Sequence, residues 1–456
     1  MTDTSRGRTT PVSLRARTAK SLGRLAGTMS RALRLGAGES VVGKIATAVD
    51  PTLLRELAKS MSDGSVVVLG TNGKTSTTAM IARGATFAGR SVVTNATGAN
   101  LVGGVVGALM GAAATAELGV IEVDEVVAPR VSEALRPRVM VWTNVFRDQL
   151  DRYGEVDLIL SYLARAAEGL HPDGALVVDA DDPGLVAAAQ RSGKRVVYFG
   201  LTKGRADAAH IAADSSNCPN CGTPLSYSQT FLGHLGIYAC PSCGWRRPEP
   251  DVAVTPVELH GARRLRAEIR AGEETVEVEL NMGGLSAASN VGAAAAALLC
   301  LGVSLDVVAE ALADMPTVFG RGEEINVGGA TGLLMLMKNP AGGNELIAEL
   351  LEDGYRRVFV AVNDRYADGL DVSWLWDIEF ERLAGHTDQL VASGRRAYDM
   401  AVRLKYAGLE VAAVPDVREA MLLMADGEEP FAILATYTAM REIRTALRGR
   451  AAHLQT

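Results

Sequence analysis

Short apolar, β-branched runs alternate with longer stretches at helical spacing through the first half of the chain. The periodicity predicts helices at residues 75–88, 156–168 and 184–192. The apolar runs predict strands at residues 66–70, 91–95, 118–123, 139–143, 175–179 and 195–199. Such alternation is typical of βαβ units, so we expect an α/β fold with a mostly parallel sheet and ligands at the carboxyl ends of its strands.

Two segments interrupt this rhythm. Residues 203–250 hold four cysteines among Pro, Gly and Asn, and the motif FGRGEE near residues 316–324 predicts a joint between domains. Strand-like alternation at 252–280 and an Ala-rich helix at 286–301 lie between them. After the joint, helices alternate with predicted strands at 358–362, 389–392 and 431–435.

A chain of 456 residues is too long for one ordinary core and suggests two or three domains. We predict a basic helical lead (residues 1–54) and a central domain (55–316) with an insertion at about 206–250. A second α/β domain (317–456) follows.

Composition and charge exclude some functions. The apolar share of 48% and charged share of 22% are typical of a soluble globular protein. A net charge of −7 argues against a general nucleic-acid binder. No stretch of about 18 apolar residues predicts a membrane span. We therefore expect a cytoplasmic protein.

The N-terminus departs from the acidic balance. Residues 1–34 contain seven Arg and one Lys against one Asp, and no long apolar core follows them, so a secretory signal is not predicted. Apolar residues at near-helical spacing between 13 and 35 predict an amphipathic helix. This helix either packs on its own domain or rests on an anionic membrane surface at the inner face of the cell membrane.

The stretch GTNGKTS, residues 70–76, follows an apolar run. Glycines after a strand let backbone N–H groups surround phosphate oxygens at the start of a helix. Lys74 adds positive charge, and the Thr75 hydroxyl is a ligand for Mg²⁺. Val68 stands where the usual G-x4-G-K-[ST] pattern has its first glycine, and the alternative is a chance turn. The flanking strand and helix favour a nucleotide site made by Gly70, Thr71, Asn72, Gly73, Lys74, Thr75 and Ser76.

Acidic residues end a neighbouring predicted strand in the stretch VIEVDE. Alternation places Glu122 and Asp124 on one face of the strand, at the usual location of a Mg²⁺ carboxylate beside a phosphate loop. We favour Glu122, because Asp124 and Glu125 also fit a helix cap or a solvated turn. The polar stretch TNVFRDQLDRYGEVD, residues 143–157, follows another strand at the same edge, and its alternative is a solvated loop.

Four of the five cysteines form two CxxC motifs separated by 18 residues. Such knuckles direct four thiolates to one point and predict a structural Zn²⁺ site, with disulfides or iron as alternatives. The predicted ligands are Cys218, Cys221, Cys240 and Cys243. Cys300 ends an apolar helical stretch and is predicted to be a buried packing residue. No Ser/His or Cys/His arrangement is evident, so the chemistry is expected to come from ATP.

Five short stretches resemble the ATP-dependent Mur ligases of peptidoglycan synthesis: GTNGKTS, TNATGANL, TNVFRDQLDRYGE, DADDP and FGRGEE. The paired CxxC motifs, LMKNPAGGNE (residues 336–345) and NDRYADGLDVSWLWDIEFE (363–381) resemble the MurT branch, the ligase-like subunits of lipid II isoglutaminyl synthases. The resemblance covers about residues 40–445. It implies a Mur-ligase-like central P-loop domain with an inserted Cys₄ zinc ribbon and a Rossmann-like C-terminal domain.

The resemblance also implies a reaction. ATP phosphorylates the α-carboxyl of D-glutamate in the lipid II stem peptide, and ammonia displaces the phosphate to give D-isoglutamine. The ammonia comes from a GatD-like glutaminase that forms a heterodimer with the MurT chain. Lys74 with Mg²⁺ would stabilise the transferred charge, with Thr75 and Glu122 holding the metal.

Further residues receive roles from the resemblance alone. Asn290 matches an adenine contact, although Ala287 stands where the family usually has His or Asn. Arg321 matches a nucleotide contact. Asn144 and Asp148 match substrate and metal residues. Gln149 replaces the family's histidine, which leaves a second metal open.

Asp371 matches an aspartate that MurT proteins contribute to the partner glutaminase, so the resemblance implies that it completes the Cys–His pair of that partner. Alternatively, Asp368 or Asp371 is an Asx-turn residue after a glycine. Trp374 and Trp376 fit either an interface or a core.

Two other functions stay open from the sequence. A stand-alone peptide ligase of the Mur or folylpolyglutamate type would add an amino acid and need no partner. A P-loop regulatory protein would use the cysteine segment to bind nucleic acid. The net charge of −7 and the scarcity of Lys and Arg near the cysteines count against the second.

Overall fold

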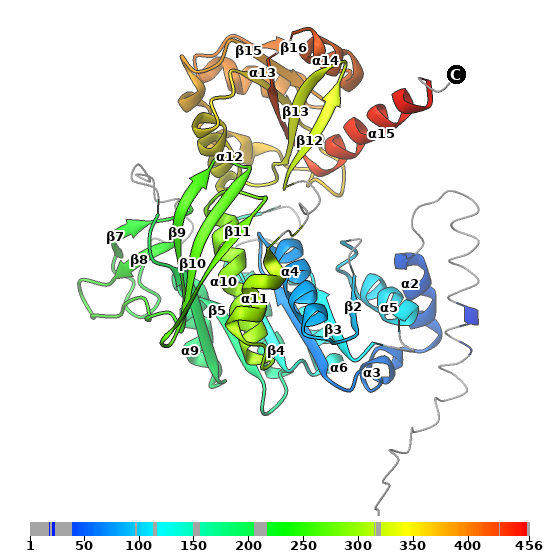
Figure 1. Cartoon of the computed structure of the whole chain (residues 1–456), viewed down its shortest axis with the longest axis vertical. Coiled ribbons are helices and arrows are strands. Elements are labelled where there is room, and N and C mark those ends of the chain that lie inside the picture. The colour runs from blue at the N-terminus through cyan, green and yellow to red at the C-terminus, as the bar shows by residue number, and fades with distance from the viewer. Residues whose placement is uncertain are drawn as a thin grey trace, which may run out of the picture.

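The computed structural model describes residues 18, 21–22, 39–95, 98–112, 116–148, 156–204, 217–313, 315, 321–427 and 429–453. Figure 1 shows two α/β units stacked along the longest axis, with the N-terminal unit below and the C-terminal unit above. The predicted amphipathic helix at 13–35 lies almost wholly outside the described residues.

The lower unit is built on a nine-stranded sheet with the order β11-β10-β9-β6-β5-β4-β1-β3-β2. Neighbouring strands from β2 to β9 are parallel, and β10 and β11 are antiparallel. The mostly parallel sheet is therefore confirmed. The six strands predicted in the first half differ from the observed ones by at most two residues at either end. The strands are β1 (Gly64–Leu69), β2 (Val92–Thr94), β3 (Leu118–Glu122), β4 (Val139–Trp142), β5 (Ala175–Asp179), β6 (Val196–Leu201), β9 (Val252–His260), β10 (Arg264–Ala271) and β11 (Glu274–Leu280).

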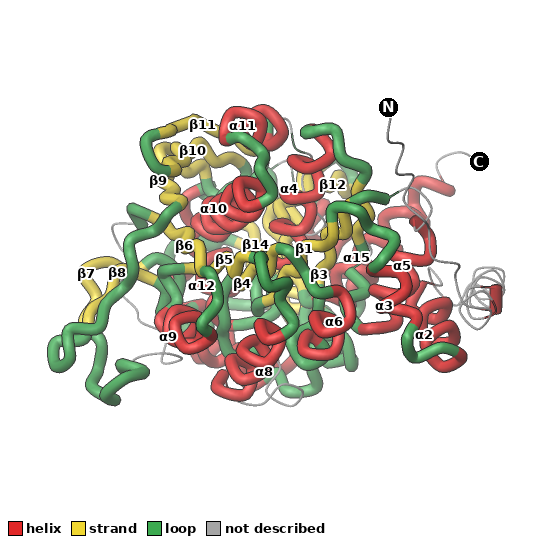
Figure 2. Tube along the Cα trace, turned by 90° about the horizontal axis from the view of Figure 1, so that it is seen from below, coloured by secondary structure: helices red, strands yellow, loops and turns green. Residues whose placement is uncertain are grey.

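Helices cover both faces of this sheet, as Figure 2 shows. One face packs on α4 (Lys74–Phe87), α10 (Leu285–Cys300) and α11 (Leu305–Leu312). The other packs on α2 (Glu39–Val49), α3 (Leu53–Ala58), α5 (Val102–Ala112), α6 (Ala128–Leu135), α8 (Val156–Glu168) and α9 (Pro183–Ser192).

Central strand β1 shows how the sequence produces these two layers. Val66 and Val68 belong to the core under α4 and α10, whereas Val67 and Leu69 belong to the opposite core. A continuous apolar run is what a parallel strand buried on both faces requires. Cys300 was predicted to be buried, but it ends α10 and is only partly buried, because the last turn of the helix reaches the surface.

The upper unit contains a six-stranded sheet with the order β12-β13-β17-β14-β15-β16. Every pair is parallel except β12 with β13. The strands are β12 (Arg321–Val327), β13 (Ala330–Leu336), β14 (Arg357–Ala361), β15 (Gln389–Ser393), β16 (Ala412–Ala413) and β17 (Phe431–Ala435).

Two apolar layers cover this second sheet. One contains α12 (Pro340–Glu352), α13 (Ala397–Tyr406) and the 3-10 helices η2 (Ser373–Asp377) and η3 (Phe380–Leu383). The other contains α14 (Val417–Ala425) and α15 (Tyr437–His453). The C-terminal part of the chain thus contains a second α/β unit, and its predicted boundary at residues 316 and 317 lies outside the described residues.

The four-cysteine segment adds a small hairpin of β7 (Ser226–Thr230) and β8 (Gly236–Ala239) beside the lower sheet. Tyr238 anchors it, since its hydroxyl donates to the Ala180 carbonyl oxygen at 3.1 Å. Among the described helices, none is long and apolar enough to cross a membrane.

Candidate active site

The glycine loop joins β1 to α4, as predicted. Gly70 and Gly73 have φ angles of +125° and +84°, which L residues rarely adopt. A Cβ on Gly70 would lie 2.3 Å from the Thr143 hydroxyl oxygen, so only glycine fits there. Helix α4 begins directly at Lys74, and its first N–H groups therefore point toward the loop. This is the geometry of a phosphate-binding loop.

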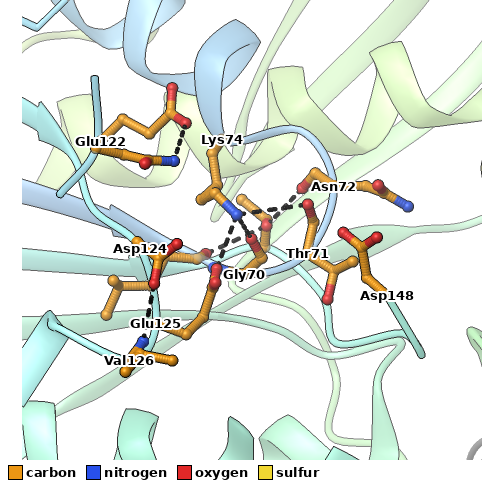
Figure 3. A network of polar contacts seen from close by, with 12 residues as sticks. Gly70, Thr71, Asn72, Lys74, Glu122, Asp124, Glu125, Val126 and Asp148 are labelled. Atoms are coloured by element: carbon orange, nitrogen blue, oxygen red, sulfur yellow. Dashed lines mark hydrogen bonds and ion pairs between the residues drawn. The ribbon is translucent and has the colours of Figure 1, made fainter. Parts of the chain in front are cut away.

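The Lys74 ammonium lies at the centre of the polar contacts around this loop (Figure 3). Its Nζ is 2.8 Å from Glu125 Oε1 and also donates to the Gly70 carbonyl oxygen. Burial lowers the pKa of Lys74, but the negative charges of Glu125 and Glu122 outweigh burial and raise it overall. The ammonium is therefore charged at neutral pH.

Glu125 does not occupy a solvated turn, so that interpretation is wrong for this residue. It is only 4% exposed, and it accepts hydrogen bonds from the Gly70 N–H at 3.0 Å and from Lys74. These are donors that a phosphate oxygen in the loop also uses. Asp124 is also buried, at 2% exposed, so it is not solvated either, although its carboxylate accepts from the Val126 N–H at 3.2 Å as a turn residue does.

Glu122 and Thr75 meet at the end of β3. The Thr75 hydroxyl donates to Glu122 Oε2 at 2.7 Å, and Asn100 Nδ2 donates to Glu122 Oε1 at 3.2 Å. The backbone of Glu122 is fixed by Asn95, which accepts from its N–H at 2.9 Å and donates to its carbonyl oxygen at 2.7 Å. A hydroxyl and a carboxylate in contact are ligands that suit Mg²⁺. The structure thus brings together the two residues predicted to hold the metal.

The described start of the polar stretch, residues 143–148, is not a solvated segment, because Thr143, Asn144 and Phe146 bond the phosphate loop. Asn144 Oδ1 accepts from the Asn72 N–H at 2.8 Å, and the Thr143 hydroxyl donates to the Asn72 carbonyl oxygen at 2.7 Å. The Phe146 N–H donates to the Thr71 hydroxyl at 3.0 Å. These bonds hold the loop from the neighbouring strand. Predicted residue Gln149 lies outside the described residues.

The upper unit contributes a lysine and an asparagine for which the sequence suggested no role. Lys338 Nζ donates to the Thr71 carbonyl oxygen at 2.6 Å and lies 3.1 Å from Asp148 Oδ2. Asn339 Nδ2 donates to Asn72 Oδ1 at 2.9 Å. Their position between the end of β13 and the start of α12, at a carboxyl edge, is the signal that could have indicated a role.

A cavity of about 400 Å³ lies between the two units. Thr75, Glu122 and residues of the phosphate loop line the cavity from the lower unit. Lys338, Asp368 and Thr436 line it from the upper unit. The carboxyl edges of both sheets therefore face one site. A larger cavity of about 640 Å³ lies beside α15, but no predicted site residue lines it.

Asn290 on α10 lies directly against the phosphate loop. Its Oδ1 accepts from the Thr77 hydroxyl at 3.3 Å and would be 2.0 Å from a Cβ placed on Gly73. The predicted adenine contact is thus next to the predicted phosphate site. Arg321 begins β12 at the joint of the two units, and its side chain lies outside what the structure describes.

Asp371 lies at a partly exposed turn before η2. Its carboxylate accepts from the Ser373 N–H at 2.8 Å and from the Ser373 hydroxyl at 3.0 Å, which is an Asx turn. Asp368 is buried and accepts from the Thr438 N–H at 2.7 Å, so it supports the start of α15. Trp376 is 52% exposed, which excludes the interpretation that both tryptophans are core residues.

The four clustered cysteines are free thiols whose sulfur atoms all lie within 4.8 Å of one another. The Cys218–Cys243 and Cys221–Cys240 sulfur separations are 3.6 and 3.5 Å. A tetrahedral site with Zn–S bonds of about 2.3 Å places its sulfurs about 3.8 Å apart. The donor set and spacing therefore fit one tetrahedral metal ion, and the disulfide alternative is not observed.

Comparison with known proteins agrees with this geometry. The MurT ligase C-terminal family model matches residues 336–440, and the Mur ligase middle domain model matches residues 68–233. The lipid II isoglutaminyl synthase (glutamine-hydrolyzing) subunit MurT of Streptococcus pneumoniae is 32% identical over 440 residues, covering 94% of this chain and 97% of that protein. The chain belongs to the MurT family. The protein of the same name from Staphylococcus aureus is 31% identical, and the alignment covers 87% of this chain and 89% of that protein.

Solved structures show that this MurT family member has the Mur ligase fold. A pseudomurein peptide ligase type C from Methanothermus fervidus superposes with a TM-score of 0.67 at 22% identity, covering 85% of this chain and 78% of that one. The MurF ligase from Thermotoga maritima in complex with ADP superposes with a TM-score of 0.62 at 16% identity, and the match covers 89% of this chain and 85% of that one. The MurT C-terminal match includes Lys338, Asn339 and Asp371.

Proposed function

We propose that this chain is the synthetase subunit of a lipid II isoglutaminyl synthase. It uses ATP to amidate the α-carboxyl of D-glutamate in the lipid II stem peptide. The decisive observation is the cavity in which Lys74 and the Thr75–Glu122 pair face Lys338 from the other unit. The family supports the reaction, because two relatives with this name match most of the chain.

The reaction proceeds through an acyl phosphate, since an ionised carboxylate is a poor electrophile. Its oxygen attacks the γ-phosphorus of ATP, the bond to the ADP oxygen breaks, and ADP leaves. Ammonia then attacks the carbonyl carbon, a C–N bond forms, and phosphate leaves with the electron pair of the C–O bond. The nitrogen loses a proton, and the product is the amide.

Different residues of the site would bind the phosphates, the metal ion and the rest of the nucleotide. Backbone N–H groups of residues 70–76 and the Lys74 ammonium bind phosphate oxygens, where negative charge accumulates during transfer. Thr75 and Glu122 would hold Mg²⁺, which neutralises phosphate charge when bound. Asn290 and Arg321 would contact the nucleotide.

The residues that follow β4 would form the part of the cavity that binds the carboxylate substrate. Asn144 and Asp148 would face the carboxylate substrate. Asp148 is held by Lys338, so the two units together would fix its position.

Ammonia is expected from a GatD-like glutaminase bound as the second subunit of a heterodimer. Of the five cysteines, four form the cluster that could hold a metal ion, and Cys300 lies on α10 and does not line the cavity. This arrangement fits a nucleophilic cysteine supplied by another chain for glutamine hydrolysis. Asp371 and the exposed Trp376 would meet this partner.

The domain division at about residues 54 and 316 and the Rossmann-like character of the C-terminal unit belong to the same proposal. We place the enzyme in the cytoplasm at the inner face of the membrane, where its lipid substrate would be reached. The basic residues among 1–34 would suit that surface.

Purified chain, with and without its candidate glutaminase, tests the function on lipid II with ATP and Mg²⁺. Ammonium alone should drive amidation, and glutamine should do so only with the partner present. Mass spectrometry detects the exchange of a hydroxyl for an amino group. Addition of a whole amino-acid residue instead would establish the stand-alone ligase, and nucleic-acid binding without amidation would favour the regulatory alternative.

The cysteine cluster is expected to hold one zinc ion per chain. Cys221→Ser should lose this zinc and lower the melting temperature by about 5 °C or more, because metal binding contributes to folding free energy. Cys300→Ser is the matched control and should retain the metal. Elemental analysis and thermal unfolding measure both quantities, and full zinc content in Cys221→Ser would refute the assignment.

Lys338→Met is expected to reduce ammonium-driven amidation about 10²-fold. The substitution removes the bond to the Thr71 carbonyl oxygen and the contact with Asp148, and displacement of about 1 Å at reacting groups has an effect of this size. Lys59→Met, which removes an exposed lysine paired with Glu56, should leave the rate unchanged. Steady-state rates at saturating ATP test this, and equal activity in both variants would contradict it.

A further inference from the structure

The hairpin of the four-cysteine segment reaches the proposed nucleotide site with its tip. Strands β7 and β8 are joined by residues 231–235. Leu232 in this tip lines a small pocket together with Gly73 of the phosphate loop, Asn144 and Asn290. An element inserted far from the glycine loop in sequence thus contributes an apolar side chain beside it.

The tip is held in one conformation. The Phe231 N–H donates to the Leu235 carbonyl oxygen at 2.8 Å, and the Leu235 N–H donates to that of Leu232 at 2.9 Å. The Gly236 N–H donates to the Asp181 carbonyl oxygen at 3.0 Å. Phe231 is buried in the core that also contains α4 and α10. The position of Leu232 is therefore fixed relative to the nucleotide pocket.

A second contact leads from the tip to the phosphate loop. His234 is fully buried, with its ring 4.9 Å from that of Phe146 and its Nε2 3.6 Å from Asp182 Oδ2. Phe146 in turn receives a hydrogen bond from the Thr71 hydroxyl at 3.2 Å and donates one to it at 3.0 Å. The hairpin thus packs against the segment that holds the loop.

The cysteines fix the other end of the same hairpin. Cys240 follows β8 directly, and its N–H donates to the Trp245 carbonyl oxygen at 2.7 Å. Tyr238 stacks on Trp245 with ring centroids 5.3 Å apart and is buried with Cys218, Leu225 and Cys240. The cluster thus supports a rigid strand pair that ends at the nucleotide pocket.

We infer that the four-cysteine hairpin is a nucleotide-positioning element, with Leu232 forming an apolar wall for the base of the nucleotide. A purine ring is flat and largely apolar, and base pockets combine apolar walls with few polar contacts. Asn290 would supply a polar contact and Leu232 the wall. The inference rests on the proposed function only in requiring that this pocket bind ATP.

The test measures binding of a fluorescent ADP analogue with Mg²⁺ to the full-length chain. Leu232→Ala should raise Kd about tenfold, since loss of most of a leucine contact is worth about 1.4 kcal/mol. Leu232→Met keeps an apolar side chain of similar volume and should restore affinity to within about threefold of the original chain.

Ile237→Ala is the matched control. Ile237 belongs to the same hairpin and packs on the same core, but it does not line the pocket. Ile237→Ala should leave Kd within about twofold of the value for the original chain, although the substitution removes an apolar volume similar to that removed by Leu232→Ala. In turnover, Leu232→Ala should raise KM for ATP and leave KM for ammonium unchanged, which a general loss of stability would not do.

Unchanged affinity in Leu232→Ala, or equal weakening in Ile237→Ala, would overturn the inference, and so would a chain that binds no nucleotide. The binding assay contains no lipid II. A chain that binds the ADP analogue with the expected pattern but does not amidate lipid II would refute the proposed function alone.

Discussion

Lys74→Met is expected to reduce ammonium-driven amidation about 10²–10³-fold, the effect of removing one preorganised charge from a transition state. Its Nζ lies between Glu125 and the Gly70 carbonyl oxygen, at the loop that would hold the transferred phosphate. Methionine keeps the length and apolar stem of the side chain but brings no charge. Single-turnover rates with lipid II and ammonium measure the loss.

The control for this experiment has to account for Glu125, the ion-pair partner of Lys74. It is buried, so Lys74→Met leaves a carboxylate without its ion-pair partner, and this cost in stability would confuse the result. The double variant Lys74→Met/Glu125→Gln removes both charges and should fold as stably as Glu125→Gln alone. Glu125→Gln keeps the ammonium and should retain most of the activity. A double variant as active as Glu125→Gln would contradict the role of Lys74.

The features predicted correctly from the sequence are local. A glycine loop between an apolar strand and a helix depends on residues that are neighbours in sequence, so Gly70, Gly73 and Lys74 were identified by spacing alone. The place of Glu122 at the end of its strand followed from alternation, which fixes which side chains reach that end, whereas its role at a metal stays a prediction. The cysteine cluster was predicted for a similar reason, since each CxxC knuckle sets its own geometry.

The features that were missed depend on contacts between distant segments. Lys338 and Asn339 reach Thr71 and Asn72 across 267 residues, and no periodicity carries that information. Glu125 was assigned to a solvated turn because its local sequence resembles one, but the phosphate loop, 51 and 55 residues away, supplies the donors that bury it. The contact of the hairpin tip with Phe146 also joins segments that are distant in sequence, so it was not predicted.

Asp371→Asn is expected to abolish most of the glutamine-driven amidation, by about 10²–10⁴-fold, and to leave the ammonium-driven reaction unchanged. The reason is that an aspartate completing a Cys–His pair holds the imidazole in its productive tautomer, and asparagine does not. Rates with each nitrogen source, measured on the complex with the glutaminase, give the two numbers from one preparation.

The same substitution separates the two interpretations of Asp371. Its Oδ1 accepts from the Ser373 N–H and its Oδ2 from the Ser373 hydroxyl. In asparagine the side-chain oxygen keeps the bond from the N–H, and the amide NH₂ can donate to the hydroxyl oxygen, so the turn survives while the charge is lost. Asp377→Asn changes an exposed aspartate in the adjoining 3-10 helix and should affect neither reaction. If Asp371 served only the turn, Asp371→Asn would behave like this control with both nitrogen sources. A selective loss with glutamine would mean that the charge acts on the partner and not on its own loop.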